Sequence, residues 1–220
     1  MADATHAGHA HHFDDALQQR DASTLGMWIF LVTEVMFFGG LFTLYVTYRA
    51  LYPDAFAHAS HHLDVTLGTF NTAVLITSSL TMALAVHSAQ TGRRGRLVLT
   101  LVLTAVLGAV FLVVKAFEYA EKFAHHLVPG PHFQFHDATL KNGAEIYFSL
   151  YFAMTGLHAT HMILGGLVMV PLIFLSARGK FGPEWYTPIE LFGLYWHFVD
   201  IVWIFLFPML YLIGRHYHAG

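Results

Sequence analysis

Residues 26–48 read GMWIFLVTEVMFFGGLFTLYVTY and decide the fold, because Glu34 is their only acidic or basic residue. A helix that crosses a bilayer needs about 20 consecutive, mostly apolar residues. The strands of a membrane barrel would instead alternate apolar and polar residues over about ten positions. We therefore predict a transmembrane helix over these residues.

Four further apolar runs have the same character, at residues 67–89, 97–119, 145–175 and 192–213. Helices suit hydrocarbon because they satisfy their own backbone hydrogen bonds. We predict an all-α, polytopic bundle of five transmembrane spans. Residues 25–215 would form this single domain, and residues 1–24 would form a polar cytoplasmic segment ahead of it.

The composition agrees, since 56% of the 220 residues are hydrophobic and 11% are charged, whereas soluble domains carry about a quarter charged residues. The absence of cysteine excludes disulfides and thiolate metal sites. A net charge of −3 gives no case for a nucleic-acid partner. No phosphate-binding glycine loop, serine elbow or HExxH motif occurs, so we expect no catalytic centre within this chain.

Basic residues in the loops predict the orientation, because Lys and Arg are enriched on the cytoplasmic side. Arg93, Arg94 and Arg96 form a compact RRGR turn between the second and third predicted spans. We therefore expect the amino terminus to be cytoplasmic and the carboxyl terminus to lie outside.

Ionisable groups at membrane depth are candidates for function. Glu34 lies near the middle of the first span, and it is either a proton-active or lipid-contacting carboxyl or a structural acid that joins two helices. His158 and His161 lie three residues apart on one helix face. They are interpreted as structural hydrogen-bonding groups or, alternatively, as metal or haem ligands, although one helix cannot place two imidazoles on opposite sides of a haem.

Two other motifs carry candidate lipid or interface residues. In YWHFVDIVWIFLF (195–207), His197 and Asp200 have the spacing of an intrahelical pair, and Trp196 and Trp203 share a flank with Asp200. We expect this group to lock the structure or to contact a lipid headgroup.

In KAFEY (115–119), Lys115 can pair with Glu118 or extend towards a lipid phosphate. A solvated pair at the membrane interface is the simplest interpretation. Two histidine groups could also collect divalent metal: HAGHAHH at residues 6–12, and His125, His126, His132 and His136.

Five motifs in order, one in each span, resemble subunit III of the haem–copper respiratory oxidases. They are TEVMFFGGLFTLY, FNTAVLITSSLTMALA, KAFEY, YFAMTGLHATHMILGG and YWHFVDIVWIFLF. The resemblance covers about residues 22–213. It equates Glu34 with a buried, carbodiimide-reactive carboxylate in the family's SE-x-x-FF motif, with Thr33 in place of Ser. It also equates His158 and His161 with a histidine pair, one of which we expect near Glu34, and Lys115 and Glu118 with a K-x-x-E pair.

The resemblance implies a non-redox accessory subunit of a proton-pumping oxidase in a bacterial inner membrane. Such a chain binds phospholipid, lies beside subunit I, belongs with subunit II and sustains proton uptake. Haem and copper would reside in the partner subunits, and other respiratory complexes are further candidate partners. Mitochondrial-type members have seven spans, so this chain resembles the short bacterial type with the last five.

Three alternatives stay open at this point. The chain could serve a quinol oxidase or a nitric oxide reductase instead of a cytochrome c oxidase. It could be a stand-alone haem b protein that uses His158, His161 and His197. It could also be a transporter with Glu34 as its proton site, although no inverted repeat is visible.

Overall fold

The computed structural model describes residue 13 and residues 15–212. Its elements in chain order are α1 (Ala16–Leu51), α2 (Pro53–Ser60), α3 (Val65–Gln90), α4 (Arg94–Ala124), α5 (Lys141–Ala177), α6 (Thr187–Phe207) and the π-helical turn η1 (Pro208–Leu212). Five helices are long and apolar enough to cross a membrane, and within the described residues the only β-structure is one isolated bridge. The predicted all-α fold with five spans is confirmed.

The helix that carries the first span begins at Ala16, ten residues before the predicted edge of the span. Asp15 explains this start, because its carboxylate accepts a hydrogen bond of 2.6 Å from the backbone N–H of Gln18 and so caps the helix. At about 1.5 Å per residue, this 36-residue helix is longer than a hydrocarbon core of about 30 Å. Part of the segment predicted as a polar extension is therefore helical, while residues 1–12 lie outside the described part.

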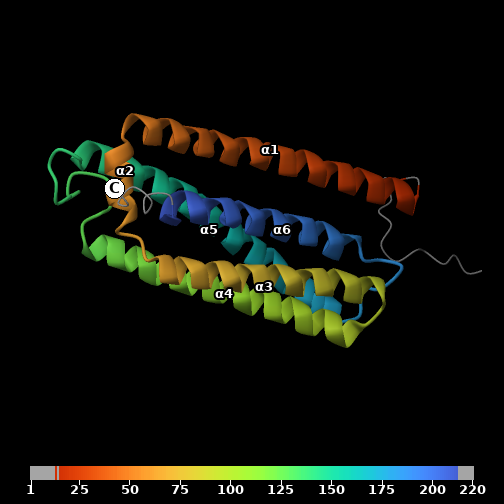
Figure 1. Ribbon diagram of the computed structural model, residues 1–220. Helices are drawn as coiled ribbons and strands as arrows, with labels where there is room; N and C mark the ends of the chain where they lie inside the picture. The colour runs from red at the N-terminus through yellow and green to blue at the C-terminus, as the bar shows by residue number, and fades with distance from the viewer. Residues whose placement is uncertain (1–12, 14, 213–220) are drawn as a thin grey trace, which may run out of the picture.

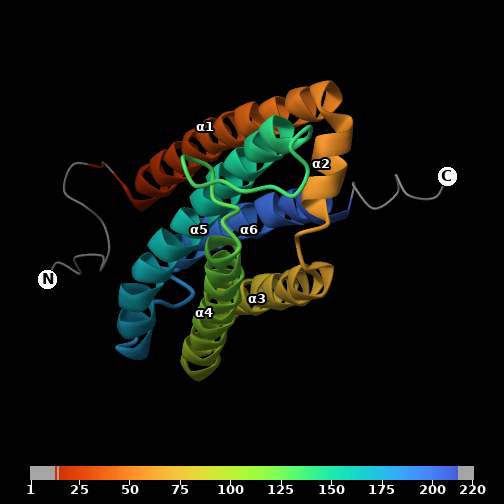
Figure 2. The ribbon, with the colours of Figure 1, turned by 90° about the vertical axis from the view of Figure 1, so that its left-hand side faces the viewer.

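The helices are arranged with α5 and α6 between α1 on one side and the α3–α4 pair on the other (Figures 1 and 2). Helix α1 packs against α5 and α6. Only 17% of the most apolar 18-residue stretch of α1 is buried, compared with 33–44% of the corresponding stretches in the other spans. The rest of α1 exposes apolar side chains such as Val35, Met36 and Phe37. Helix α1 is thus the most peripheral span of the chain.

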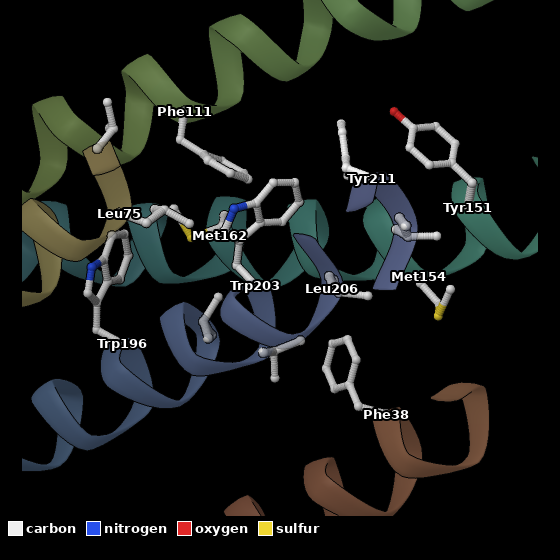
Figure 3. Packing of buried hydrophobic residues seen from close by; sticks show 14 of the residues in the cluster. Phe38, Leu75, Phe111, Tyr151, Met154, Met162, Trp196, Trp203, Leu206 and Tyr211 are labelled. Atoms are coloured by element: carbon white, nitrogen blue, oxygen red, sulfur yellow. The ribbon is translucent and has the colours of Figure 1, made fainter. Parts of the chain in front are cut away.

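The core between the two sides is built on the tryptophans of α6. Trp203 is fully buried, and its ring packs edge-on against Phe111 of α4 with ring centroids 4.8 Å apart (Figure 3). Trp196 lies against Gly108 and Gly165, where an added Cβ atom would come within 3.0 Å and 2.9 Å of its ring. The two glycines therefore let α4 and α5 approach α6 closely.

The short helix α2, which the sequence analysis did not predict, closes the same end of the bundle as η1 (Figure 1). Pro208 opens η1, and a proline lacks the N–H that would continue an α-helical hydrogen-bond ladder. Two tyrosines satisfy carbonyls of the widened turn: Tyr45 of α1 donates to Met209 O (2.5 Å), and Tyr147 of α5 donates to Leu210 O (2.8 Å). The end of α6 is thereby fastened to two other spans.

The opposite end of the bundle is held by the RRGR turn. The Arg94 guanidinium donates a hydrogen bond to the backbone carbonyl of Ala177 at the end of α5. A cation is favourable there because the last carbonyls of a helix carry a partial negative charge. Gly92 and Gly179 have φ values of +69° and +76°, which permit the tight reversals on either side of this contact.

Candidate functional site

The first candidate site joins α1 to α5 through Glu34 and His161. Glu34 Oε2 lies 3.0 Å from His161 Nε2, and the two side chains are 18% and 11% exposed. The ring of Phe38 covers one side of the imidazole, with centroids 5.4 Å apart, and the Tyr195 hydroxyl donates to the backbone carbonyl of His161. The expectation that one of the paired histidines lies near Glu34 is confirmed.

The hydrogen bonds of His161 determine how the pair holds its proton. Nδ1 lies 2.9 Å from the backbone carbonyl of Leu157, which can only accept, so Nδ1 must carry a hydrogen. Nε2 then either accepts the proton of a neutral Glu34 carboxyl or, in the imidazolium, donates to its carboxylate. In both cases one proton lies between the two residues, so this site can hold and transfer a proton.

His158 has a separate environment from His161, although both lie on α5. Its ring lies between Phe111 of α4 and Trp203 of α6, each 5.3 Å away between centroids. The side chain is fully buried, and neither ring nitrogen has a hydrogen-bond partner among the described residues. The structure therefore brings Glu34 together with His161 and not with His158.

A second polar cluster surrounds Lys115 and Glu118 of α4. Lys115 Nζ lies 3.1 Å from Glu118 Oε2 and donates to the hydroxyls of Tyr211 (2.8 Å) and Tyr151 (3.2 Å). Both tyrosines in turn donate to Glu118 Oε1, at 2.5 Å and 2.8 Å. The ammonium also lies 5.1 Å from the ring of Trp203, within cation–π range.

The interpretation of Lys115 and Glu118 as a solvated interfacial pair is wrong, since they are 4% and 1% exposed. The pairing itself is present at the predicted spacing. Tyr151 comes from α5, Trp203 from α6 and Tyr211 from η1, so the ion pair is enclosed between spans. It lies too deep in the protein to reach a lipid phosphate.

The seam between α3 and α6 holds the remaining predicted residues. The indole N–H groups of Trp196 and Trp203 donate to Ser78 Oγ (3.0 Å) and Thr72 Oγ1 (3.1 Å). The Nδ1 atom of His197 lies 2.7 Å from Ser79 Oγ. These three bonds fix α6 against α3 at two levels, one at Ser78 and Ser79 and the other at Thr72.

The predicted intrahelical pair of His197 and Asp200 is not formed, because the imidazole bonds to α3 instead. Asp200, Trp196 and Trp203 are 2%, 1% and 0% exposed, so a direct contact of these three with lipid headgroups is wrong. Burial against neighbouring helices is the reason. Among the four candidate residues of this motif, His197 alone keeps partial exposure.

Comparison with known proteins shows that the model of the family "Cytochrome c oxidase subunit III" matches residues 2–215. The chain belongs to this family. Cytochrome c oxidase subunit 3 of Corynebacterium diphtheriae is 36% identical over 200 residues, which cover 90% of this chain and 91% of the relative. The corresponding protein of Thermostichus vulcanus is 29% identical over 210 residues, with 92% of both chains covered.

A mammalian relative fits the expected difference in length. Cytochrome c oxidase subunit 3 of Tragelaphus oryx is 30% identical over 197 residues, which cover 86% of this chain but 69% of the relative. The chain is therefore a multi-pass membrane protein of a respiratory oxidase family, and it is similar in length to the two bacterial relatives.

The four histidines of the segment between α4 and α5 do not assemble into one group. His125 and His136 line a hollow of about 390 Å³ beside Lys122, whereas His126 and His132 line another of about 240 Å³. In residue 13 and residues 15–212, no group of three or more His, Asp or Glu side chains is placed to hold a metal ion. The amino-terminal HAGHAHH lies outside the described residues.

Sequence reasoning missed the partners that come from distant parts of the chain. Tyr151 and Tyr211 complete the cluster around Glu118, and Ser78, Ser79 and Thr72 receive the polar groups of α6. These hydroxyls carry no local signal, since tyrosine, serine and threonine are common in apolar spans. A spacing rule could find only the Lys115–Glu118 pair, which lies within one helix.

Proposed function

We propose that this chain is a non-redox accessory subunit of a proton-pumping haem–copper terminal oxidase of the cytochrome c oxidase type. The observation that carries the proposal is the family match over residues 2–215, together with relatives named cytochrome c oxidase subunit 3. In this role the chain stabilises subunit I, binds phospholipid and sustains proton uptake. The names of the relatives favour cytochrome c over quinol as the electron donor of the complex.

The geometry of the histidines supports a chain without its own electron carrier. Both ring nitrogens of His161 are engaged, and His158 is enclosed by two aromatic rings. His197 is bonded to Ser79. A haem would need two imidazoles facing each other across open space, so the alternative of a stand-alone haem b protein is disfavoured. A Soret band in the purified single chain would revive it.

Proton uptake is supported by the proton that Glu34 and His161 share. This pair lies at α1, the span that is least buried by the other helices. Neutral pairs of this kind hold protons at membrane depth, where isolated charges are costly. The same pair would serve a transporter. The family assignment makes an oxidase subunit the better-supported function.

Phospholipid binding is supported by an apolar groove of about 490 Å³ between α1, α5 and α6. Its lining is almost wholly hydrocarbon and includes Phe30, Leu164 and Phe192, which suits an acyl chain. Arg20 lies near the same end of the bundle, where it pairs with Glu190 at 3.6 Å. We propose that this end faces the cytoplasm of a bacterial inner membrane, as the basic RRGR turn indicates.

The decisive experiment is purification of the complete oxidase in mild detergent with and without this subunit. We expect subunits I and II to copurify with the wild-type chain. We also expect haem and copper contents to be unchanged in its absence, while the enzyme loses activity after fewer turnovers. An unchanged lifetime during turnover would contradict the supporting role, and a partner complex without a dinuclear copper subunit would favour the quinol oxidase or nitric oxide reductase alternative.

A further inference from the structure

Asp200 is the one acid of the α3–α6 seam, and it lacks the partners that its neighbours have. Both carboxylate oxygens are buried without a hydrogen bond to any described residue. Ser79 lies near this carboxyl, but its hydroxyl is bonded to His197 Nδ1 at 2.7 Å. Trp196 and Trp203, which precede and follow Asp200 along α6, are bonded to α3. A buried polar group without a partner is costly, so a group from outside the chain is expected.

Asp200 lies in the wall of a groove of about 270 Å³ between α3 and α6. Ser79 and His197 also line it, and the remaining lining residues are aliphatic. Four of these are 45–59% exposed and form the rims: Ile76, Leu80, Ile201 and Ile204. The groove therefore opens towards the membrane and not towards water.

The depth of Asp200 limits what can reach it. The fifth span runs from Thr187 to Leu212, and Asp200 is at its middle. Lipid headgroups lie at the edges of a hydrocarbon core about 30 Å thick, so they are roughly 15 Å away. A phospholipid could lay an acyl chain in the groove but could not bring a polar group to the carboxyl.

The shape of the rims suits a helix. On α3, Ile76 and Leu80 lie one helical turn apart, and positions 197, 201 and 204 follow the same helical repeat on α6. The two sets form two ridges with the groove between them. Ridges of a third helix pack into such a groove. Inside a membrane, polar side chains join helices by hydrogen bonds across the interface.

We propose that this groove receives a transmembrane helix of a partner subunit, and that Asp200 forms a hydrogen bond with a polar side chain of that helix at mid-membrane depth. The inference rests on the proposed function, because it requires that the chain work inside an oxidase complex. The inference identifies the α3–α6 face as the surface that binds the partner subunit, and it identifies the partner side chain that meets Asp200 as a polar, hydrogen-bonding one.

The first test compares Asp200→Leu with Asp200→Asn in the intact complex. The leucine removes the polar atoms, whereas the amide keeps both a donor and an acceptor. We expect Asp200→Leu to lower the ratio of bound to released subunit in mild detergent about tenfold, and Asp200→Asn to lower it less. Ser176→Ala is the matched control, since Ser176 is also buried without a partner but belongs to the far end of α5. Equal retention of Asp200→Leu and wild type would overturn the inference.

The second test leaves Asp200 in place and does not depend on the folding of a variant core. A photo-crosslinking residue replaces the exposed Leu80 on the rim, and the complex is irradiated in native membranes. An adduct with a membrane-spanning segment of another subunit supports the inference, and adducts with lipid or another small molecule alone overturn it. If the chain copurifies with no other polypeptide at all, the proposed function fails as well, so the two failures are distinguishable.

Discussion

The buried ion pair of α4 permits a quantitative test of how the spans are joined. Glu118 accepts hydrogen bonds from Lys115, Tyr151 and Tyr211, and no side chain of the pair is more than 5% exposed. Glu118→Leu would leave the Lys115 ammonium in the protein interior with only two hydroxyl oxygens as partners. Lys115→Met would leave an uncompensated carboxylate in the same place.

Loss of one partner of a buried pair typically costs about 3–5 kcal/mol, whereas replacement of both by apolar residues is often neutral. Each single variant should therefore lower the free energy of unfolding by that amount. The double variant Lys115→Met/Glu118→Leu should lie within about 2 kcal/mol of wild type, because only the two tyrosine hydroxyls then lose partners. The resulting interaction energy of several kcal/mol would be well above the values found for independent sites.

The assay is reversible unfolding of the full chain in mixed micelles, followed by tryptophan fluorescence, since Trp203 lies 5.1 Å from the ammonium. The pair of Arg20 and Glu190, 3.6 Å apart and with side chains 45% and 33% exposed, is the control and should contribute less than about 1 kcal/mol. If the costs of the two single α4 variants simply add in the double variant, the cluster is not a coupled unit and the reasoning fails.

Three further outcomes follow from individual contacts. Glu34→Gln should leave the subunit assembled in the membrane, because the amide can donate to the imidazole acceptor, and it should abolish carbodiimide labelling at this position. Gly165→Ala should destabilise the fold by about 1–3 kcal/mol, because its Cβ would lie 2.9 Å from Trp196, whereas Gly166→Ala, with no atom within 4 Å, should be neutral or stabilising by up to about 1 kcal/mol. Burial and nearby cationic side chains lower the pKa of His62. Its contribution to stability is therefore present above about pH 6.5 and is lost as the pH falls through the folded-state pKa. The thermal unfolding temperature of His62→Gln should fall less on acidification than that of wild type.

Each of these outcomes can be contradicted directly. Release of the Glu34→Gln subunit from the membrane would contradict the expected replacement of the carboxyl by an amide, and carbodiimide labelling that persists in this variant would show that another carboxyl is the reactive one. Equal unfolding temperatures for the two glycine variants would refute the close approach at α6. A pH dependence identical to that of wild type would show that His62 does not titrate as its surroundings require.

The spans could be predicted because their signal is a sum over many residues. A run such as residues 97–119 needs no tertiary information to be recognised, and its helix extends over Arg94–Ala124. The ends could not be predicted as well. The start of α1 depends on a single cap at Asp15, and α2 is an eight-residue helix whose stability comes from packing against α5 and η1.

The site was predictable to the extent that its partners are close in sequence or belong to a family motif. Lys115 and Glu118 are one helical turn apart, so spacing alone suggests their bond. Glu34 and His161 are 127 positions apart, and only the resemblance to a family paired them. The burial of Asp200 depends on which face of α6 meets α3, and an all-round apolar helix carries no periodicity that reveals it.

The shared proton of Glu34 and His161 also bears on how α1 stays attached. Whether the carboxyl or the imidazole carries the proton, the site as a whole is electroneutral, so the surrounding lipid is exposed only to a reoriented dipole. A second proton, or the loss of the first, would leave a net charge beside hydrocarbon. Loss of the first proton would also break this hydrogen bond between α1 and α5, because Nε2 and the carboxylate would then have no hydrogen between them. Movement of the proton within the site and anchoring of α1 are therefore compatible, and only a change in the number of protons would set them against each other.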